Sequence, residues 1–312
     1  MQLGVHLPLI DFAGREWSLQ RLTSYVDTAR DLGFDALATN DHLVYPRPWL
    51  DGIVSFASVL EHTGEMALVS TVFLPVIRGP VALAKAAAAL DILSGGRLVL
   101  GIGAGSSARD YIATGLPFDE RWRRLDEALR VLRYQLSDGN PEFSGAFYAT
   151  NGLRLEPRPP RAEGPPFWIG AWGSDAGLRR VARFGDGWLA SGYNTTPERL
   201  RAGRAVLDAA LVKRGRAPSD VPTALSTMWT YVTEDRSEQR SRLEALAGVL
   251  NHPAEEVAQQ ALIGPAAECA AKLNAYAAAG VQHVFVWPID DETRQIERFR
   301  RDVTPLLDKP IA

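Results

Sequence analysis

The fold class follows from one stretch of the sequence, Pro80-Val-Ala-Leu-Ala-Lys-Ala-Ala-Ala-Ala-Leu-Asp-Ile-Leu93, followed by Ser94-Gly-Gly96 and Arg97-Leu-Val-Leu-Gly-Ile102. The alanine-rich part predicts a helix, since it begins with a proline, whose missing N–H costs nothing in the first helical turn. The glycine pair predicts a turn, and the apolar run after it predicts a buried strand. A helix that leads through a tight turn into a buried strand is typical of a repeated βα pattern on a parallel sheet.

The same alternation of short apolar runs and long amphipathic segments continues along most of the 312 residues. The apolar runs predict strands at 3–7, 35–39, 67–74, 97–102, 167–169, 187–190, 223–232 and 281–287. The amphipathic segments predict helices at 18–32, 80–93, 120–136, 175–184, 197–214, 266–279 and 291–303. Eight such units at this length favour a closed (β/α)8 TIM barrel, with one domain over 1–312. An open doubly wound sheet is the structural alternative.

One segment, 138–166, breaks this rhythm. It is rich in proline, glycine and aromatic residues, and short alternating pieces surround Phe147-Tyr148 and Leu153-Arg-Leu155. These pieces predict an inserted hairpin within the single domain.

Composition excludes several classes of protein. The hydrophobic fraction of 46% and charged fraction of 23% exclude a disordered chain, and the net charge of -3 argues against a nucleic-acid partner. The lone Cys269 excludes an internal disulfide, and five scattered histidines without an HExxH motif argue against a metal site. Without a signal peptide or an apolar run long enough to span a membrane, we expect a cytoplasmic protein.

A barrel of this kind carries its functional residues where the strands end, at the C-terminal face. Glycines follow the fourth predicted strand there, in Gly101-Ile-Gly103-Ala-Gly105. This run is a weak match to a dinucleotide-binding loop, because the third glycine is misplaced and no acidic residue ends a clear next strand. The alternative is a tight loop at the barrel mouth, where the backbone must approach a ligand or another loop closely.

Three blocks of the chain resemble the luciferase-like monooxygenase superfamily. They are the run from Thr71-Val-Phe-Leu-Pro-Val-Ile-Arg78 to Gly105, the motif Leu116-Pro-Phe-Asp-Glu-Arg121, and Pro165-Pro-Phe-Trp-Ile-Gly-Ala-Trp-Gly-Ser174 followed by Gly185-Asp-Gly-Trp188. The resemblance covers nearly the whole chain in order. It implies a barrel that binds FMN or the deazaflavin coenzyme F420, and often a homodimer.

The stretch Asn40-Asp41-His42-Leu43 is similar to the Asp-His pair of the F420-dependent branch. It implies an oxidoreductase that transfers a hydride between coenzyme F420 and a small organic substrate. One alternative is an FMN-dependent monooxygenase supplied by a separate reductase; another is a protein that binds the cofactor without turnover.

The resemblance also implies roles for His42 and Asp41. His42 is the candidate for proton transfer, since histidine exchanges protons near neutral pH, and Asp41 is expected to contact the cofactor. The residues alone also fit an ordinary turn, with His42 packed on a neighbour.

Further cofactor contacts are implied at the ends of three strands. A non-proline cis peptide at Thr71–Val72, next to Ser70, would support the ring. Small residues would line the cofactor side chain, and a glycine-rich loop would hold its phosphate at a helix N-terminus, although plain capping by Ser174 fits that loop equally well. These positions are Gly103, Ala104, Gly105 and Ser106, and Gly170, Ala171, Trp172, Gly173 and Ser174.

The chain departs from the superfamily pattern at Ser106, where sugar-phosphate dehydrogenases of the F420 branch carry an acidic residue. A sugar phosphate is therefore not the expected substrate. An apolar substrate pocket is predicted from one histidine and five aromatic residues, although core packing explains any single one of them as well. They are His6, Trp49, Tyr111, Trp188, Tyr193 and Trp287.

Overall fold

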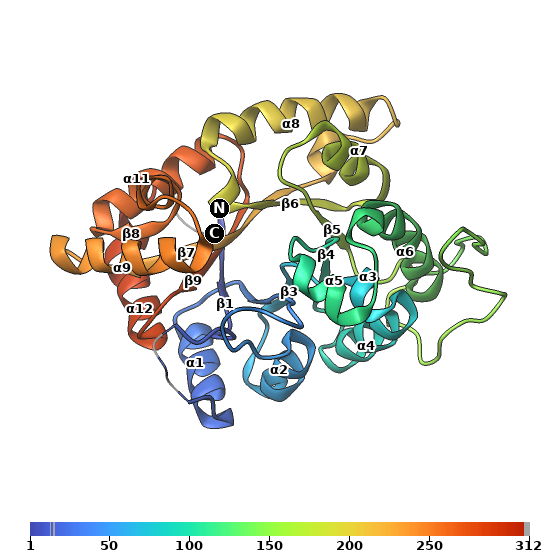
Figure 1. Cartoon of the computed structure of the whole chain (residues 1–312), viewed down its shortest axis with the longest axis horizontal. Helices are drawn as coiled ribbons and strands as arrows, with labels where there is room; N and C mark the ends of the chain where they lie inside the picture. Colours follow the sequence, from blue (N-terminus) through green and yellow to red (C-terminus); the bar gives the residue numbers. More distant parts are fainter. Residues whose placement is uncertain (13, 15, 309–312) are drawn as a thin grey trace.

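The computed structural model describes residues 1–12, 14 and 16–308 and forms a closed barrel of parallel strands (Figure 1). β1 pairs with both β2 and β9, and β6 pairs with β7, so the sheet has no free edge within the barrel. The predicted (β/α)8 barrel is confirmed, and the open sheet is excluded. The barrel strands are β1 (Gln2–His6), β2 (Ala36–Thr39), β3 (Ala67–Ser70), β4 (Leu98–Ile102), β5 (Phe167–Gly170), β6 (Gly187–Ser191), β7 (Thr223–Val232) and β9 (His283–Pro288).

Helices surround the strands, as Figure 1 shows. The predicted helix 80–93 has those bounds, and Ser18 caps α1 by accepting a hydrogen bond from the Arg21 N–H. Several shorter helices, such as α5 and α10, were not predicted because they are too short to show a period. The helices are α1 (Leu19–Asp31), α2 (Gly52–Val59), α3 (Pro75–Arg78), α4 (Pro80–Leu93), α5 (Ala108–Thr114), α6 (Arg121–Leu136), α7 (Asp175–Phe184), α8 (Pro197–Val212), α9 (Arg236–Leu250), α10 (Ala254–Gln260), α11 (Ala266–Ala278) and α12 (Glu292–Arg298). No helix in the described part of the chain is long and apolar enough to cross a membrane.

The core has two layers, because successive strand residues face opposite sides of the sheet. Outward-facing side chains pack under the helices. The inward-facing group is small and contains Ala36, Ala38, Val69, Trp168, Leu189, Ala224 and Phe285. Strands come close together there: a Cβ on Gly101 would lie 1.7 Å from the Ser70 carbonyl oxygen. Only glycine fits at that position.

β3 is shorter than predicted. The strand ends at Ser70, where the expected 67–74 run continues into the cis peptide bond Thr71–Val72 and then into α3. Its β-branched residues favoured an extended strand, but the regular pairing of β3 ends before the cis bond, and after it Phe73 forms a single parallel bridge with Ile102 of β4.

β7 contains a bulge that changes which side chains face the barrel mouth. Leu225 pairs with Val284 and Met228 with Val286, so β7 carries one residue more than β9 between these pairs. Thr227, inside the bulge, has a φ of 58°. Beyond it the alternation is reversed, and Trp229 occupies an inward position that a regular strand would give to Met228. A short strand that was not predicted, β8 (Leu262–Gly264), pairs with the far end of β7.

The segment 138–166 follows α6 and forms the green loop at the right edge of Figure 1. It contains one antiparallel bridge, between Ser144 and Ala149. Glu127 of α6 accepts hydrogen bonds from the backbone N–H groups of residues 146–148, which fixes the tip of the bridge to the helix.

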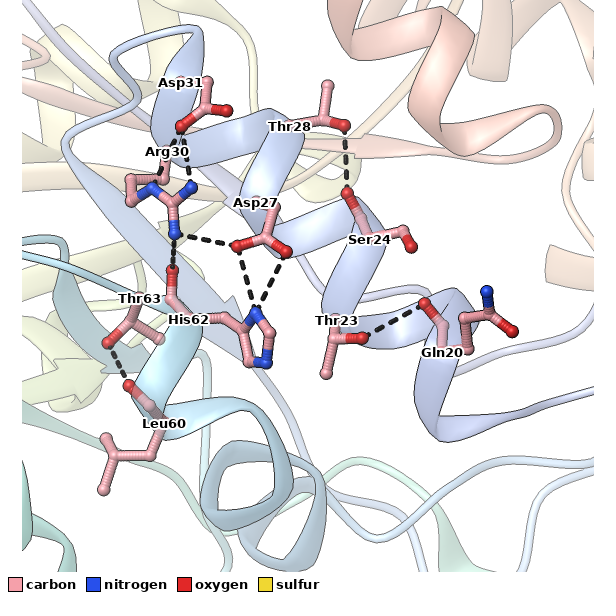
Figure 2. Close-up of polar contacts among 10 residues, drawn as sticks. All are labelled: Gln20, Thr23, Ser24, Asp27, Thr28, Arg30, Asp31, Leu60, His62 and Thr63. Atoms are coloured by element: carbon pink, nitrogen blue, oxygen red, sulfur yellow. Dashed lines mark hydrogen bonds and ion pairs between the residues drawn. The ribbon is translucent and has the colours of Figure 1, made fainter.

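Polar side chains also fix the N-terminal end of the barrel. The Asp27 carboxylate, on α1, accepts a hydrogen bond from Arg30 at 2.7 Å (Figure 2). It also lies 3.0 Å from the Nδ1 of His62, a residue in the short helical turn before β3. Arg30 also donates to the His62 carbonyl oxygen. The hydrogen bond from His62 and the nearby charges lower the pKa of Asp27. All three side chains are about 40% exposed, and they lie at the end of the barrel away from the mouth.

Candidate active site

His42 and Asp110 form a hydrogen-bonded pair at the mouth of the barrel. His42 lies in the loop after β2, and Asp110 lies on α5, which follows β4. The His42 Nδ1 is 2.9 Å from the Asp110 Oδ2, while Oδ1 accepts hydrogen bonds from the N–H groups of Leu43 (2.9 Å) and Val44 (2.7 Å). An ionised carboxylate can only accept, so Nδ1 carries the proton of this bond. Nε2 of His42 is left to exchange a proton with a ligand.

Asp110 is ionised in this setting. Burial raises its pKa, but the hydrogen bonds from His42 and from the two backbone N–H groups outweigh burial and leave the pKa below its ordinary value. Asp110 was not among the predicted site residues, because α5 was not predicted. The spacing Ser107-Ala-Arg-Asp110, which is typical of a helix start, was the available signal.

A row of aromatic rings continues from His42 along the mouth. The His42 ring centroid lies 4.8 Å from that of Tyr45 and 4.7 Å from that of Trp49. Trp49 meets Trp287 edge to face at 5.7 Å, and Trp287 stacks on Trp229 at 4.4 Å. Rings from the loop after β2 and from β7 and β9 therefore form one wall. The β7 bulge explains why Trp229 was not predicted among them.

His6, at the end of β1, lies on the other side of Trp287. Their rings stack at 4.0 Å with an angle of 9° between the planes. Burial lowers the pKa of His6 to about 3, so the ring is neutral at physiological pH. Its Nε2 lies 3.1 Å from the Thr71 Oγ1, which links β1 to the cis peptide after β3.

Several buried polar atoms around the mouth have no hydrogen-bond partner among the described residues. Buried polar groups in proteins are nearly always hydrogen-bonded, so an unpartnered group of this kind requires an explanation. The atoms are Nδ1 of His6, Oγ1 of Thr39, Oδ1 of Asn40, and Nε1 of Trp49, Trp229 and Trp287. Their gathering at the C-terminal ends of strands is typical of a site that is completed by a ligand.

The cis bond expected at Thr71–Val72 is present, and glycines make room for the side chain that follows it. A Cβ on Gly103 would lie 2.7 Å from the Val72 Cγ2, and one on Gly170 would lie 3.0 Å from Cγ1. Val72 thus lies between the ends of β4 and β5 and forms part of the floor of the mouth. Ser70, in contrast, is used within the sheet, where its hydroxyl donates to the Gly101 carbonyl oxygen.

The loop after β5 leads directly into the N-terminus of α7. Gly173 has a φ of 87° with open space where a Cβ would lie, and Ser174 caps α7 by accepting from the Gly177 N–H. Other N–H groups of the first helical turn have no partner within the helix. Trp172 is 60% exposed. Both predicted uses, phosphate binding and capping, are compatible with this geometry.

Asp41 lies beside the site, but its carboxylate is already bound. Arg78 of α3 donates to both oxygens at 2.5 Å, and the Leu74 N–H donates to Oδ2 at 3.3 Å. Burial raises the pKa of Asp41, and Arg78 opposes this shift. Arg78 also binds Asp51, the N-cap of α2. The predicted contact between Asp41 and a cofactor stays a prediction.

Two predicted pocket residues lie elsewhere. Tyr111 packs against Phe118 and donates its hydroxyl to the Ala104 carbonyl oxygen at 2.5 Å. Trp188 faces outward on β6, because Leu189 faces inward, and its indole N–H donates to the Ala171 carbonyl oxygen. Both belong to the layer under the helices, which corrects the expectation that they line the substrate pocket.

The remaining predicted residues lie around the same mouth. Tyr193 packs at the edge of the aromatic group that contains Trp229 and Trp287. Ala104 is buried, and Gly105 has a φ of 80°, while Ser106 is exposed. No group of three potential metal ligands occurs among the described residues.

The profile of a family described as luciferase-like monooxygenase matches residues 12–260 of this chain. The chain belongs to this family. Among curated relatives of this luciferase-like protein, it is similar to an F420-dependent glucose-6-phosphate dehydrogenase from Rhodococcus erythropolis, at 28% identity over 98% of both chains. It is also similar to an F420-dependent hydroxymycolic acid dehydrogenase from Mycobacterium tuberculosis, at 27% identity over 94% of this chain and 86% of the other.

Solved structures support the same fold. An F420-dependent secondary alcohol dehydrogenase in complex with an F420-acetone adduct superimposes with a TM-score of 0.84, at 18% identity over 99% of both chains. The monooxygenase RslO1 from Streptomyces bottropensis superimposes with a TM-score of 0.83, at 22% identity over 98% of this chain and 99% of the other. At these identities the likeness establishes the barrel alone.

Proposed function

We propose that this protein is an oxidoreductase that transfers a hydride between coenzyme F420 and a small organic substrate. The observation that carries the proposal is the His42–Asp110 pair, which leaves the His42 Nε2 free for a substrate proton at the barrel mouth. The curated relatives, which are named as F420-dependent dehydrogenases, support F420 as the cofactor.

The residues around the mouth fit a flavin-like cofactor. Gly103 and Gly170 let the Val72 side chain lie at the floor of the mouth, and the unpartnered Nδ1 of His6, Oγ1 of Thr39 and Oδ1 of Asn40 supply hydrogen-bonding groups for the polar edge of a ring. The loop at Gly173 and the first turn of α7 would hold the phosphate, because helix N-termini favour anions. When bound, the cofactor supplies the hydride chemistry that protein side chains lack.

The protein itself moves the proton. For oxidation of an alcohol, the neutral His42 accepts the hydroxyl proton at Nε2, and for reduction of a carbonyl, the protonated ring donates it. Asp110 holds the ring by its Nδ1–H and stabilises the charged form, so it acts as a positioning residue. The partly buried rings of Tyr45 and Trp49 beside His42 limit the access of water at this point.

Titration of the purified protein with F420 and with FMN, without oxygen, tests the proposal. We expect saturable binding of F420, and reduction of bound F420 by an alcohol substrate at a rate that oxygen does not change. Tight binding of reduced FMN with oxygen consumption that requires a separate reductase would instead indicate a monooxygenase. F420 binding without redox chemistry on any alcohol or ketone would indicate a binding protein.

We also propose that two copies form a homodimer and that the protein acts in the cytoplasm. A groove of about 400 Å³ between α1 and α2 supports the dimer, because it is lined by Leu22 and Leu50 and by the exposed Leu19 (59%) and Val54 (66%). Light scattering of the wild type and of Val54→Glu tests this: we expect a dimer that the charged variant weakens. A wild type that is monomeric at high concentration would contradict it.

A further inference from the structure

We infer that the substrate is a neutral, flat and largely apolar alcohol or ketone, and not a sugar phosphate. The inference rests on the proposed function, which supplies the hydride chemistry but leaves the substrate class open. It is carried by three tryptophan N–H groups at the mouth and by the arrangement of charges around them.

The indole N–H groups of Trp49, Trp229 and Trp287 are buried without an acceptor among the described residues. An indole N–H can only donate. A buried donor without an acceptor is costly to a folded protein, and three in one contact group need an explanation beyond packing. An oxygen atom of a bound substrate, from a carbonyl or hydroxyl group, is an acceptor for one or two of them, since such an oxygen has two lone pairs.

The surfaces around these donors are flat and apolar. Trp229 and Trp287 stack on each other at 4.4 Å and are buried, whereas Phe12, which meets Trp229 edge to face at 5.4 Å, is only partly buried and leaves apolar surface for a ligand. Ile10, Ile289 and the partly buried Tyr193 belong to the same apolar group. Such walls favour a ligand with a flat hydrocarbon surface, because aromatic rings bury large areas and stack in offset or edge-to-face geometry.

The charged groups nearby are already engaged in other contacts. Arg242 lies over the Tyr231 ring and pairs with Asp290 at 2.8 Å, and Glu238 accepts the Tyr231 hydroxyl. Arg47 lies 5.9 Å from the centre of the Phe12 ring and donates to the Phe12 carbonyl oxygen. In the described part of the chain, the donors without an acceptor at the mouth are the three indole N–H groups, which carry no charge. A phosphate dianion beside them would lose its water without gaining a cation, which is strongly unfavourable.

The reaction balances with the groups named. In the reducing direction, the carbonyl carbon accepts a hydride, with both its electrons, from the bound reduced deazaflavin. The carbon–oxygen double bond becomes single, and the oxygen takes a proton from the His42 Nε2. In the oxidising direction, the alcohol would give its hydroxyl proton to the His42 Nε2 and its hydride to the oxidised cofactor, and the carbon–oxygen bond would become double.

Calorimetry with two matched probes tests the binding claim without turnover. The probes are 2-acetylnaphthalene and 2-ethylnaphthalene, which differ by a carbonyl oxygen. We expect the protein to bind the ketone more tightly, and Trp229→Phe to weaken the ketone by roughly 3- to 10-fold, as loss of one hydrogen bond predicts, with little change for the hydrocarbon. Trp122→Phe, at an exposed ring on α6, is the matched control and should leave both affinities unchanged.

Trp287→Phe is measured in parallel, with melting temperatures, so that loss of folding in one variant cannot imitate loss of a hydrogen bond. Equal affinity for the two probes in the wild type would overturn the inference. So would an equal loss of both affinities in well-folded Trp229→Phe and Trp287→Phe.

A second assay separates this inference from the proposed function. F420-loaded protein is given 1-(2-naphthyl)ethanol or glucose 6-phosphate, and F420 reduction is followed. We expect the naphthyl alcohol to be oxidised at least 100-fold faster, expressed as kcat/KM. Faster oxidation of glucose 6-phosphate would refute the substrate class and leave the proposed function intact. Failure to bind F420 would refute the proposed function. The calorimetric comparison would still show whether the mouth prefers a ketone to a hydrocarbon.

Discussion

The polar side chains at the two ends of the barrel differ in whether they find hydrogen-bond partners within the protein. At the N-terminal end, Asp27, Arg30 and His62 satisfy one another on a partly exposed surface (Figure 2). At the C-terminal end, neutral groups such as the Nδ1 of His6 and the Nε1 of Trp287 are buried without partners. The first arrangement is complete and serves stability, whereas the second needs a ligand. This division is the general pattern of TIM barrels.

The remaining unpartnered atoms support the contrast. Within the described residues, buried atoms without partners away from the mouth belong to Asp91, Arg161 and Arg300. Each of these side chains makes a hydrogen bond through another atom: Asp91 with Arg161 at 2.8 Å, and Arg300 with the Gly33 carbonyl oxygen. At the mouth, the indole N–H groups have no second polar atom to use.

The largest effect is expected from His42→Ala. Loss of the proton-transfer group should lower kcat by roughly 100- to 10,000-fold. The affinity for F420, measured by fluorescence titration, should change little, because the proposed phosphate loop is intact. Turnover equal to that of the wild type would exclude His42 from the chemistry.

Asp110→Asn should have the next largest effect, because an amide cannot stabilise the charged form of His42. We expect kcat to fall by roughly 10- to 1,000-fold and the pH dependence of kcat to shift, with Asp110→Glu restoring part of both. If Asp110 had a purely structural role, Asp110→Asn would leave the pH dependence of kcat unchanged, and Asp110→Glu would not restore activity.

The stability of Asp110→Asn should also depend on pH. The folded pKa of Asp110 is lowered, so its ionised form stabilises the fold above the unfolded pKa. That contribution is lost as the pH falls through the folded pKa. The difference in melting temperature between the wild type and the variant should therefore be largest near neutral pH and shrink in acid; a constant difference would contradict the assignment.

Gly103→Ala should have an intermediate effect at the floor of the mouth. Its Cβ would lie 2.7 Å from the Val72 Cγ2, so Val72 must move. We expect a loss of about 1–3 kcal/mol in the free energy of unfolding, with weaker F420 binding. Gly248→Ala, on α9 with open space around the new Cβ, is the control and should stabilise the protein slightly. Equal free energies of unfolding for Gly103→Ala and Gly248→Ala would mean that Val72 moves aside at little cost.

The smallest effect is expected at the other end, from His62→Ala. Partly exposed ion pairs contribute little, so the free energy of unfolding should fall by about 0–1 kcal/mol. Steady-state kinetics should not change. A loss of turnover comparable to that of His42→Ala would erase the distinction between the two ends.

The sequence predicts the barrel well because its signals are local and repeated. Helix 80–93 and strand 223–232 have the predicted bounds, since proline, glycine and apolar runs mark them directly. The cis bond at Thr71–Val72 was expected from the family resemblance alone, because its β-branched residues would equally suit an ordinary strand.

The site was harder to predict, since it depends on which way side chains face. The position of Trp229 depends on an extra residue in β7, which no periodicity of the sequence reveals. Trp188 follows a glycine at a strand start and gives no sign of whether it faces the helices or the mouth. Asp110 approaches His42 across 68 residues, a contact that spacing alone cannot indicate.

A crystal structure of the protein with coenzyme F420 tests the central claim most directly. The account predicts the deazaflavin ring at the mouth between Val72 and His42, with the phosphate against Gly173 and the first turn of α7. A ring bound elsewhere, or saturating F420 that leaves the mouth empty, would contradict it.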